Sequence, residues 1–255
     1  MKFILKKIIP SFLWEFIKNI FYLKQRYQYS KISNDISANF KNVVYNHKFN
    51  ILSELCEKYG SDKGFIDHNS KKPYKWKPHT YTSYYHSIFN LSRNNIKNVF
   101  ECGLGTNNPN FKSNMTIDGV PGASLRVWRD YFINAKIYGA DIDKEILFEE
   151  ERIKTFYVDQ LNTNSIKNLW NSIKINDFDI IIDDGLHEPE ANYNFFINSF
   201  QKLKANGVYI IEDVPNQYLL DLQNKLIDYD TDIITLFSKY KKNYIQNNLI
   251  VIRKS

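Results

Sequence analysis

Two adjacent aspartates and a histidine close the apolar segment FDIIIDDGLHEPEANY, residues 178–193. Asp183 and Asp184 follow three isoleucines, and His187 comes three residues after the second aspartate. Two neighbouring carboxylates repel each other unless a cation or a proton lies beside them. Histidine titrates near neutral pH and often acts as a general base. The segment therefore predicts either a cation site with a base beside it, or helix-capping aspartates with a solvent-facing histidine.

Four other apolar segments also end in, or close to, an acid. The residues at these ends are Glu101 before Gly103 and Gly105, Asp141 with Asp143, Asp159 with Gln160, and Glu212 with Asp213. In an open sheet of parallel strands, ligands bind outside the carboxyl ends of the strands. An acid after a single strand is common, because Asp favours loops and helix N-caps. Acids at the ends of all five apolar segments instead predict a shared binding site.

The G-x-G turn at Gly103 and Gly105 lets the backbone approach a ligand closely. Asp141 could accept the ribose hydroxyls of either NAD or S-adenosylmethionine, so both cofactors remain open at this point. Three features favour S-adenosylmethionine. Glu101 suits a cationic ligand, residues 107–124 separate the turn from the next helix, and the expected terminal hairpin is typical of methyltransferases rather than of dehydrogenases. Asn108 stands where a dinucleotide fingerprint has its third glycine, which disfavours NAD.

The pattern from Ile96 onward is a repeated alternation of short apolar runs and amphipathic segments, which is typical of an α/β fold with a mostly parallel sheet. Residues 231–237 and 244–254 read as a terminal antiparallel hairpin. The expected strands are 98–103, 136–141, 154–159, 179–184 and 207–213, and the expected helices are 122–132, a short one at 144–151, 164–173, 188–204 and 217–227.

Residues 1–50 are expected to form a helical N-terminal extension, and residues 51–95 a helical cap beside the cofactor and substrate, ahead of the main domain at 96–255. The stretch 31–95 reads as helix and loop. Leu13, Phe16, Ile17, Ile20 and Phe21 share one helical face. That face could pack on the domain or on a second subunit, or residues 1–30 could contact a membrane surface.

The chain has 255 residues, of which 43% are hydrophobic, so it can bury the core of one large domain. Only Cys56 and Cys102 are cysteines, without a metal-type or redox-type partner, which favours a reducing, cytoplasmic setting. The net charge of +6 favours anionic partners. Because the lysines are scattered and no RNA-binding module is recognised, nucleic acid is not the expected partner.

Between about Leu52 and Ile252 the chain resembles class I S-adenosylmethionine-dependent methyltransferases. It is most similar to the sugar O-methyltransferases of macrolide tailoring (mycinamicin and macrocin type) and of bacterial capsule loci. The matching segments are YGSDKG (59–64), HTYTSYY (79–85), ECGLGTNN (101–108), GASLRVWRDYF (122–132), YGADID (138–143), FYVDQ (156–160), IIDDGLH (181–187) and YIIEDV (209–214). The first 50 residues are not covered.

The resemblance implies a Rossmann-like methyltransferase fold and a role for each matched residue. Glu101, Gly103 and Gly105 would hold the amino-acid end of S-adenosyl-L-methionine, Asp141 with Ile142 the ribose, and Asp159 with Gln160 the adenine. Asp184, Glu212 and Asp213 would bind Mg²⁺, and His187 would be the general base. Further cofactor-site candidates are Asp183, Tyr81, Thr82, Ser124 and Lys63, of which Lys63 could instead face the substrate.

These roles imply an O-methyltransferase that acts on a sugar hydroxyl in a nucleotide-linked or polysaccharide precursor, as in capsule or antibiotic biosynthesis. Mg²⁺ would acidify the hydroxyl and His187 would take its proton. The alternatives are O- or N-methylation of a non-sugar molecule, an RNA methyltransferase, an NAD oxidoreductase and a non-catalytic binding protein. Relatives of this kind often self-associate, so a homo-oligomer is expected.

Overall fold

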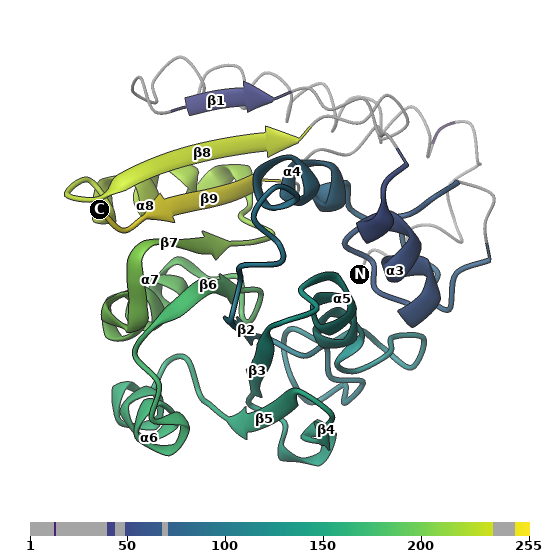
Figure 1. Cartoon of the computed structure of the whole chain (residues 1–255), viewed down its shortest axis with the longest axis horizontal. Helices are drawn as coiled ribbons and strands as arrows, with labels where there is room; N and C mark the ends of the chain where they lie inside the picture. Colours follow the sequence, from purple (N-terminus) through teal and green to yellow (C-terminus); the bar gives the residue numbers. More distant parts are fainter. Residues whose placement is uncertain (1–12, 14–39, 44–48, 68–70, 237–247) are drawn as a thin grey trace.

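A nine-stranded sheet with helices on both faces forms the described part of the computed structural model, which comprises residues 13, 40–43, 49–67, 71–236 and 248–255 (Figure 1). The strand order is β1-β8-β9-β7-β6-β2-β3-β5-β4. The strands are β1 (Phe40–Val43), β2 (Asn98–Cys102), β3 (Lys136–Asp141), β4 (Glu149–Glu150), β5 (Ile153–Tyr157), β6 (Phe178–Asp183), β7 (Leu203–Ile211), β8 (Asp230–Leu236) and β9 (Asn248–Arg253).

The centre of the sheet, β7-β6-β2-β3-β5, is parallel throughout. Strand β9 runs antiparallel to both β7 and β8, and this confirms the terminal antiparallel hairpin. All five predicted central strands are present. The carboxyl ends of β2, β3, β6 and β7 consequently lie along one edge, where the acids of the sequence were expected to meet.

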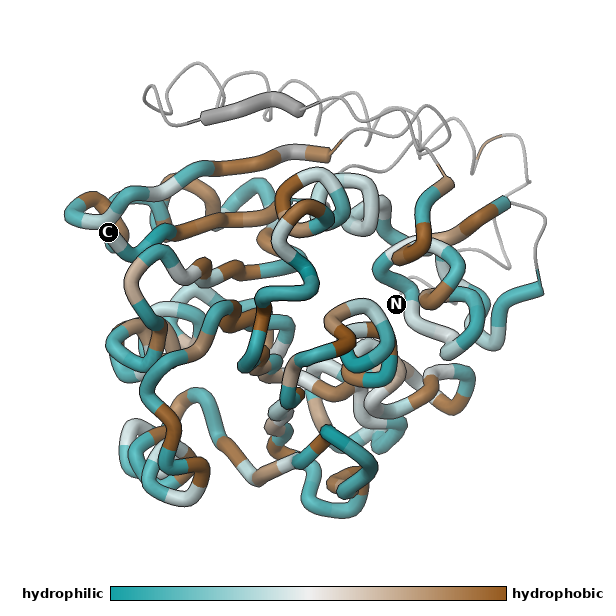
Figure 2. Tube along the Cα trace, in the orientation of Figure 1, coloured by the Kyte–Doolittle hydropathy of each residue, from teal (hydrophilic) through white to brown (hydrophobic). Residues whose placement is uncertain are grey.

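Two layers of helices cover the sheet. Helices α6 (Thr163–Ile173), α7 (Pro189–Ser199) and α8 (Leu219–Lys225) pack on one face, and α3 (Ile51–Tyr59), α4 (Tyr81–Phe89) and α5 (Ala123–Tyr131) on the other (Figure 1). Successive residues of β9 alternate between the two cores: Leu249 and Val251 join the α3–α5 side, and Ile250 and Ile252 the α6–α8 side. Burial on both faces explains the continuous apolar runs, one of which is visible along β9 in Figure 2.

Local chemistry fixes the helix ends. The Asn50 side chain accepts hydrogen bonds from the first turn of α3, and Gly60 ends that helix in a left-handed conformation, with φ of 78°. Asn162 caps α6 in the same way, and Pro189 occupies the first turn of α7. The loop that follows Gly60 returns the chain to the sheet edge and delivers Lys63 there.

Two expectations were wrong. The short helix expected at 144–151 is a single 3-10 turn, Lys144–Ile146, followed by strand β4. Glu150 lies in that strand because Arg126 and Arg129 of α5 bind its carboxylate, at 2.6 and 3.1 Å. Within the stretch expected to be helix and loop, residues 40–43 form β1, which pairs in parallel with β8.

The amphipathic helix expected near the N-terminus lies outside the described residues, except for Leu13, which is helical and exposed. The predicted division into three segments stays a prediction. Among the described residues, no helix combines the length and the apolar character needed to cross a bilayer.

Candidate active site

A cleft of about 1070 Å³ opens at the carboxyl ends of β2, β3, β6 and β7. Residues 110–116 line it from one side, and residues 61–63 and 76–79 contribute from the segments around α3 and α4. It gathers most of the predicted site residues: Lys63, Gly103, Gly105, Ser124, Asp141, Ile142, Asp159, Gln160, Asp184, His187, Glu212 and Asp213.

The glycine turn is needed for close approach of two chain segments. Gly103 has a φ of +93°, and a Cβ there would lie 2.1 Å from the backbone oxygen of Asp184. Gly105 has a φ of +79°, and its Cβ would lie 2.1 Å from the sulfur of Met115. Glycine tolerates this backbone conformation and has no side chain to clash, so the turn stays thin where the cleft begins.

Asp141 ties the glycine turn to the end of β3. Its Oδ2 accepts the Leu104 N–H at 2.7 Å and its Oδ1 accepts the Asp143 N–H at 2.9 Å. Burial raises the pKa of Asp141, and the two backbone N–H groups oppose that rise. The carboxylate thus lies at the cleft wall, and Ile142, beside it, is 41% exposed as a flat apolar surface.

Asp183 is fully buried and points away from the cleft. Gln160 Nε2 donates to its Oδ1 at 2.6 Å and Asn192 Nδ2 to its Oδ2 at 3.0 Å. Burial raises the pKa of Asp183 to about 6, while the two amides lower it. Gln160 also accepts the Leu186 N–H at 2.8 Å, so one amide connects Asp183 to the loop that carries His187.

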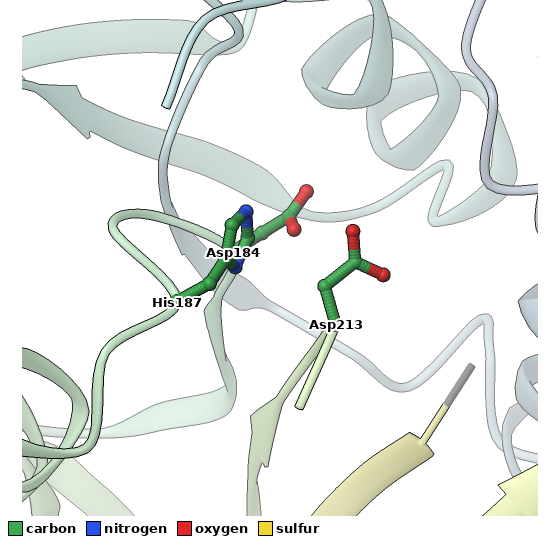
Figure 3. A group of neighbouring side chains, drawn as sticks. All are labelled: Asp184, His187 and Asp213. Carbon is green, nitrogen blue, oxygen red and sulfur yellow. The ribbon is translucent and has the colours of Figure 1, made fainter. Parts of the chain in front are cut away.

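Asp184, His187 and Asp213 converge at the floor of the cleft (Figure 3). One ligand atom from each lies within 4.8 Å of the other two. His187 and Asp213 have φ angles of +57° and +53°, which non-glycine residues seldom adopt. His187 Nδ1 is buried and has no hydrogen-bond partner among the described residues. Such strain in two neighbouring loops is a feature of functional sites.

Asp213 stays ionised more readily than its neighbours. Burial would raise its pKa, but His79, His187 and the Tyr81 hydroxyl lower it. The Tyr81 hydroxyl donates to Asp213 Oδ1, and His79 Nδ1 lies 3.4 Å from the same oxygen without hydrogen-bond geometry. The pKa of Asp184 is raised, because burial and the Asp213 charge outweigh Lys63. The negative charge of the floor is therefore held most firmly at Asp213.

Lys63 lies among three carboxylates behind this floor. Its ammonium is 2.6 Å from Asp184 Oδ2, 2.6 Å from Glu212 Oε2 and 3.1 Å from Glu101 Oε1. Burial alone would lower the pKa of Lys63, but the three carboxylates raise it well above its ordinary value. Lys63 is therefore a permanent cation, and only 3% of it is exposed.

The donors at the floor fit a divalent ion in part. Asp184 and Asp213 supply carboxylate oxygens, which Mg²⁺ prefers, and His187 supplies a nitrogen within the same reach. Glu212, the third predicted ligand, is not in this group. Its carboxylate faces Lys63 and the Tyr85 hydroxyl instead.

Several known proteins are similar to this chain in sequence or in fold. No family model matches the sequence. A rhamnosyl tetracenomycin-C 2'-O-methyltransferase of Streptomyces olivaceus is 31% identical over 72% of this chain and 42% of its own length. The demethylmacrocin O-methyltransferase of Streptomyces fradiae is 34% identical over 55% of this chain and 33% of its own. The mycinamicin VI 2''-O-methyltransferase of Micromonospora griseorubida is 31% identical over 66% of this chain and 37% of its own.

Among solved structures, the methyltransferase MycE of the mycinamycin pathway, in complex with Mg and SAH, has a TM-score of 0.58 and 25% identity. The match covers 82% of this chain and 56% of MycE. The chain has the class I methyltransferase fold and is similar in sequence to these O-methyltransferases. It spans less than half the length of the curated relatives it matches. The resemblance inferred from the motifs is confirmed.

Four predicted contacts of this class I methyltransferase fold do not line the cleft. Glu101, Tyr81, Thr82 and Asp183 are all fully buried. Glu101 accepts the Trp128 N–H and faces Lys63, and Thr82 packs under Gly64 and pairs with Ser53. These residues lie behind the cleft wall, where most of their polar side-chain atoms contact other groups of the protein.

Other lining residues were missed as site residues. Trp76 and Lys77 line the cleft, as do the apolar side chains of Met115, Val158 and Leu161. The Pro-punctuated segment 71–79 carried a signal, because its alternating lysines and aromatics suit a lid above an anionic substrate. The apolar residues carried no signal, since they resemble ordinary loop residues.

Proposed function

We propose that the chain transfers the methyl group of S-adenosylmethionine to a sugar hydroxyl. The observation that carries the proposal is that one cleft joins the glycine turn, Asp141 and Asp159 to the strained pair His187 and Asp213. The first group suits the nucleoside and amino-acid parts of the cofactor. The second suits a cationic methyl donor and a hydroxyl that must lose its proton.

Each group in the floor has a role in this reaction. The carboxylates of Asp184 and Asp213 would attract the positive sulfonium more than its neutral product, which favours binding of the cofactor over retention of the product. As the hydroxyl oxygen attacks the methyl carbon, the bond from carbon to sulfur breaks. The hydroxyl proton passes to His187, leaving a methyl ether and S-adenosylhomocysteine. The unpartnered Nδ1 and the strained backbone support His187 as the base.

Mg²⁺ is the cation proposed for this site. Asp184 and Asp213 would hold it, with His187 within reach. When bound, such an ion would lower the pKa of a nearby hydroxyl. If His187 ligates the ion through one nitrogen, only the other nitrogen can act as a base. The presence of Mg in the MycE complex, a homologue of this chain, supports the proposal.

The rim of the cleft supports an anionic sugar acceptor, such as a nucleotide-linked or polysaccharide precursor of capsule type. Lys77 lines the cleft and is exposed, and Lys112 also lines it, paired with Glu188. Trp76 is fixed by donation from its Nε1 to Asp62 at 2.6 Å, which leaves an aromatic face for a sugar or a base. Self-association, membrane contact through residues 1–30 and a cytoplasmic location stay predictions.

The test is methyl transfer from labelled S-adenosylmethionine to a panel of acceptors. The panel contains nucleotide sugars, neutral glycosides, a catechol and RNA, each with Mg²⁺ or with EDTA. We expect label in a sugar as a methyl ether stable to alkali, with nucleotide sugars preferred and EDTA inhibiting. Label in the catechol or the RNA alone would contradict the proposal. A Lys77→Met variant should lose the preference for nucleotide sugars but still methylate neutral ones.

A further inference from the structure

Lys63 is delivered to the acidic floor by a tightly packed loop. A Cβ on the next residue, Gly64, would lie 2.3 Å from the side chain of Thr82, so the loop lies directly against α4. The Lys63 N–H lies 3.4 Å from Ser61 Oγ, and its carbonyl accepts the Thr82 N–H at 3.3 Å. The backbone is thus held on both sides, and the ammonium is fixed between the carboxylates.

Each carboxylate oxygen of Glu212 and Glu101 already faces a buried group of the protein. Glu212 Oε2 is 2.6 Å from Lys63, and its Oε1 accepts the Tyr85 hydroxyl at 2.5 Å. Glu101 Oε2 accepts the Trp128 N–H at 2.6 Å, and its Oε1 faces Lys63 at 3.1 Å. Both residues are at most 1% exposed. A divalent ion at Glu212 would either lie beside a buried ammonium or displace it and leave it unpaired, and both outcomes are costly.

Asp184 differs from these two residues. Lys63 contacts its Oδ2, but its side chain is 25% exposed and belongs to the group with His187 and Asp213. It therefore lies between two cations, the internal ammonium and the proposed ion. The ammonium holds its carboxylate in place and weakens its attraction for a second positive charge.

We propose that Lys63 is a positioning residue that replaces a metal ion at Glu212. The ion-binding set is then Asp184, Asp213 and His187, without Glu212. This inference rests on the metal part of the proposed function. It follows that the site binds divalent ions more weakly than three free carboxylates would, and that Glu101 and Glu212 stay paired whether or not an ion is bound.

The test measures Mn²⁺ binding to the full chain by the loss of the free-ion electron paramagnetic resonance signal. Asp213→Asn should weaken Mn²⁺ binding by about tenfold or more. Glu212→Gln keeps the shape of the side chain and should leave the Mn²⁺ dissociation constant close to that of the unmodified chain. If Glu212→Gln folds normally and weakens Mn²⁺ binding as much as Asp213→Asn does, the inference is wrong and the metal proposal stands.

Removal of the ammonium gives the complementary result. Lys63→Met should tighten Mn²⁺ binding by about tenfold, because it removes a positive charge beside Asp184, while Lys77→Met, at an exposed lysine of the same cleft, should not change it. Because Lys63→Met alone strands buried carboxylates, the charge-neutral double variant Lys63→Met with Glu212→Gln keeps the test valid if the single variant unfolds. Weaker Mn²⁺ binding in the folded double variant would overturn the inference. Absence of Mn²⁺ binding by the unmodified chain would overturn both it and the metal proposal, and methyl transfer would then decide the rest.

Discussion

His187 reaches the cleft from a left-handed backbone conformation that is held in place by its surroundings. The Gln160 side chain accepts the Leu186 N–H and donates to Asp183. Asn192 also donates to Asp183. A buried polar network, which begins one residue before His187, thus stabilises the strained backbone conformation of His187. A histidine that only faced solvent would not need this support.

Substitution of the proposed base gives the first prediction. His187→Gln keeps a polar side chain but cannot take a proton at neutral pH, so kcat should fall by roughly 10²–10⁴-fold. Binding of S-adenosylhomocysteine, measured by calorimetry, should change little. His86→Gln is the matched control, because His86 lies on α4 and contacts Tyr131 away from the cleft. Equal activity of the two variants would remove His187 from the mechanism.

Asp183 should make folding stability depend on pH in a defined direction. Its pKa is raised from 3.8 to about 6 by burial, so the folded chain holds the proton more firmly than the unfolded chain. The resulting stabilisation is fully present below about pH 4 and is lost as the pH rises through 6, by up to about 3 kcal/mol. Urea titration measures the unfolding free energy of the unmodified chain and of Asp183→Asn. Between pH 4 and 7 the unmodified chain should lose stability relative to the variant. Parallel curves would contradict this.

The limits of sequence reasoning show most clearly at Lys63 and Glu212. The strand-end acids were found because each follows an apolar run. Their division into proposed ion ligands and partners of Lys63 was not predictable, because Lys63 and Glu212 lie 149 positions apart in the chain. The position of a buried ammonium depends on how the loop after α3 packs against α4, and no local pattern encodes that packing.

At the scale of elements, two tryptophans on opposite faces of the sheet allow a matched comparison. Trp128 of α5 donates to the Glu101 carboxylate at 2.6 Å, and Trp170 of α6 donates to the Ser199 hydroxyl at 3.0 Å. Both are almost fully buried. The first bond supports a carboxylate of the Lys63 cluster, whereas the second is an ordinary neutral bond.

Trp128→Phe should therefore destabilise the chain more than Trp170→Phe. Loss of a hydrogen bond to a charged group costs about 1.5–3 kcal/mol, and loss of a neutral one about 0.5–1.5 kcal/mol. Both variants lose a similar ring volume, so their difference isolates the polar contact. Urea unfolding of the two variants checks this, and a larger loss in Trp170→Phe would show that Glu101 does not depend on α5.

Elements were predicted well where periodicity was strong and less well where contacts decide the structure. The buried central strands could be predicted because their apolar runs are continuous. The short strand β4 was mistaken for helix, because Arg126 and Arg129 draw Glu150 into it. Strand β1 was missed, since four residues are too few to show a period, and pairing with β8 alone defines it.

At the scale of the whole molecule, the sheet order is what brings the site together. Strands β2, β3, β6 and β7 are separated along the chain by helices, yet their ends line one cleft. The alternation of elements predicted this edge before any contact was known. The net charge of +6 did not predict the character of the site. The floor is acidic and the exposed lysines lie at its rim, so one cleft presents both signs of charge.

The central claim is that this cleft binds S-adenosylmethionine, and thermal unfolding with added ligands tests it most directly. S-adenosylhomocysteine at about 100 times its dissociation constant should add roughly 2.7 kcal/mol to folding stability, and NAD should add nothing. Gly103→Ala should abolish the shift, because its Cβ would meet the Asp184 backbone. An upward shift with S-adenosylhomocysteine alone is the predicted result. A shift with NAD and none with S-adenosylhomocysteine would contradict the account.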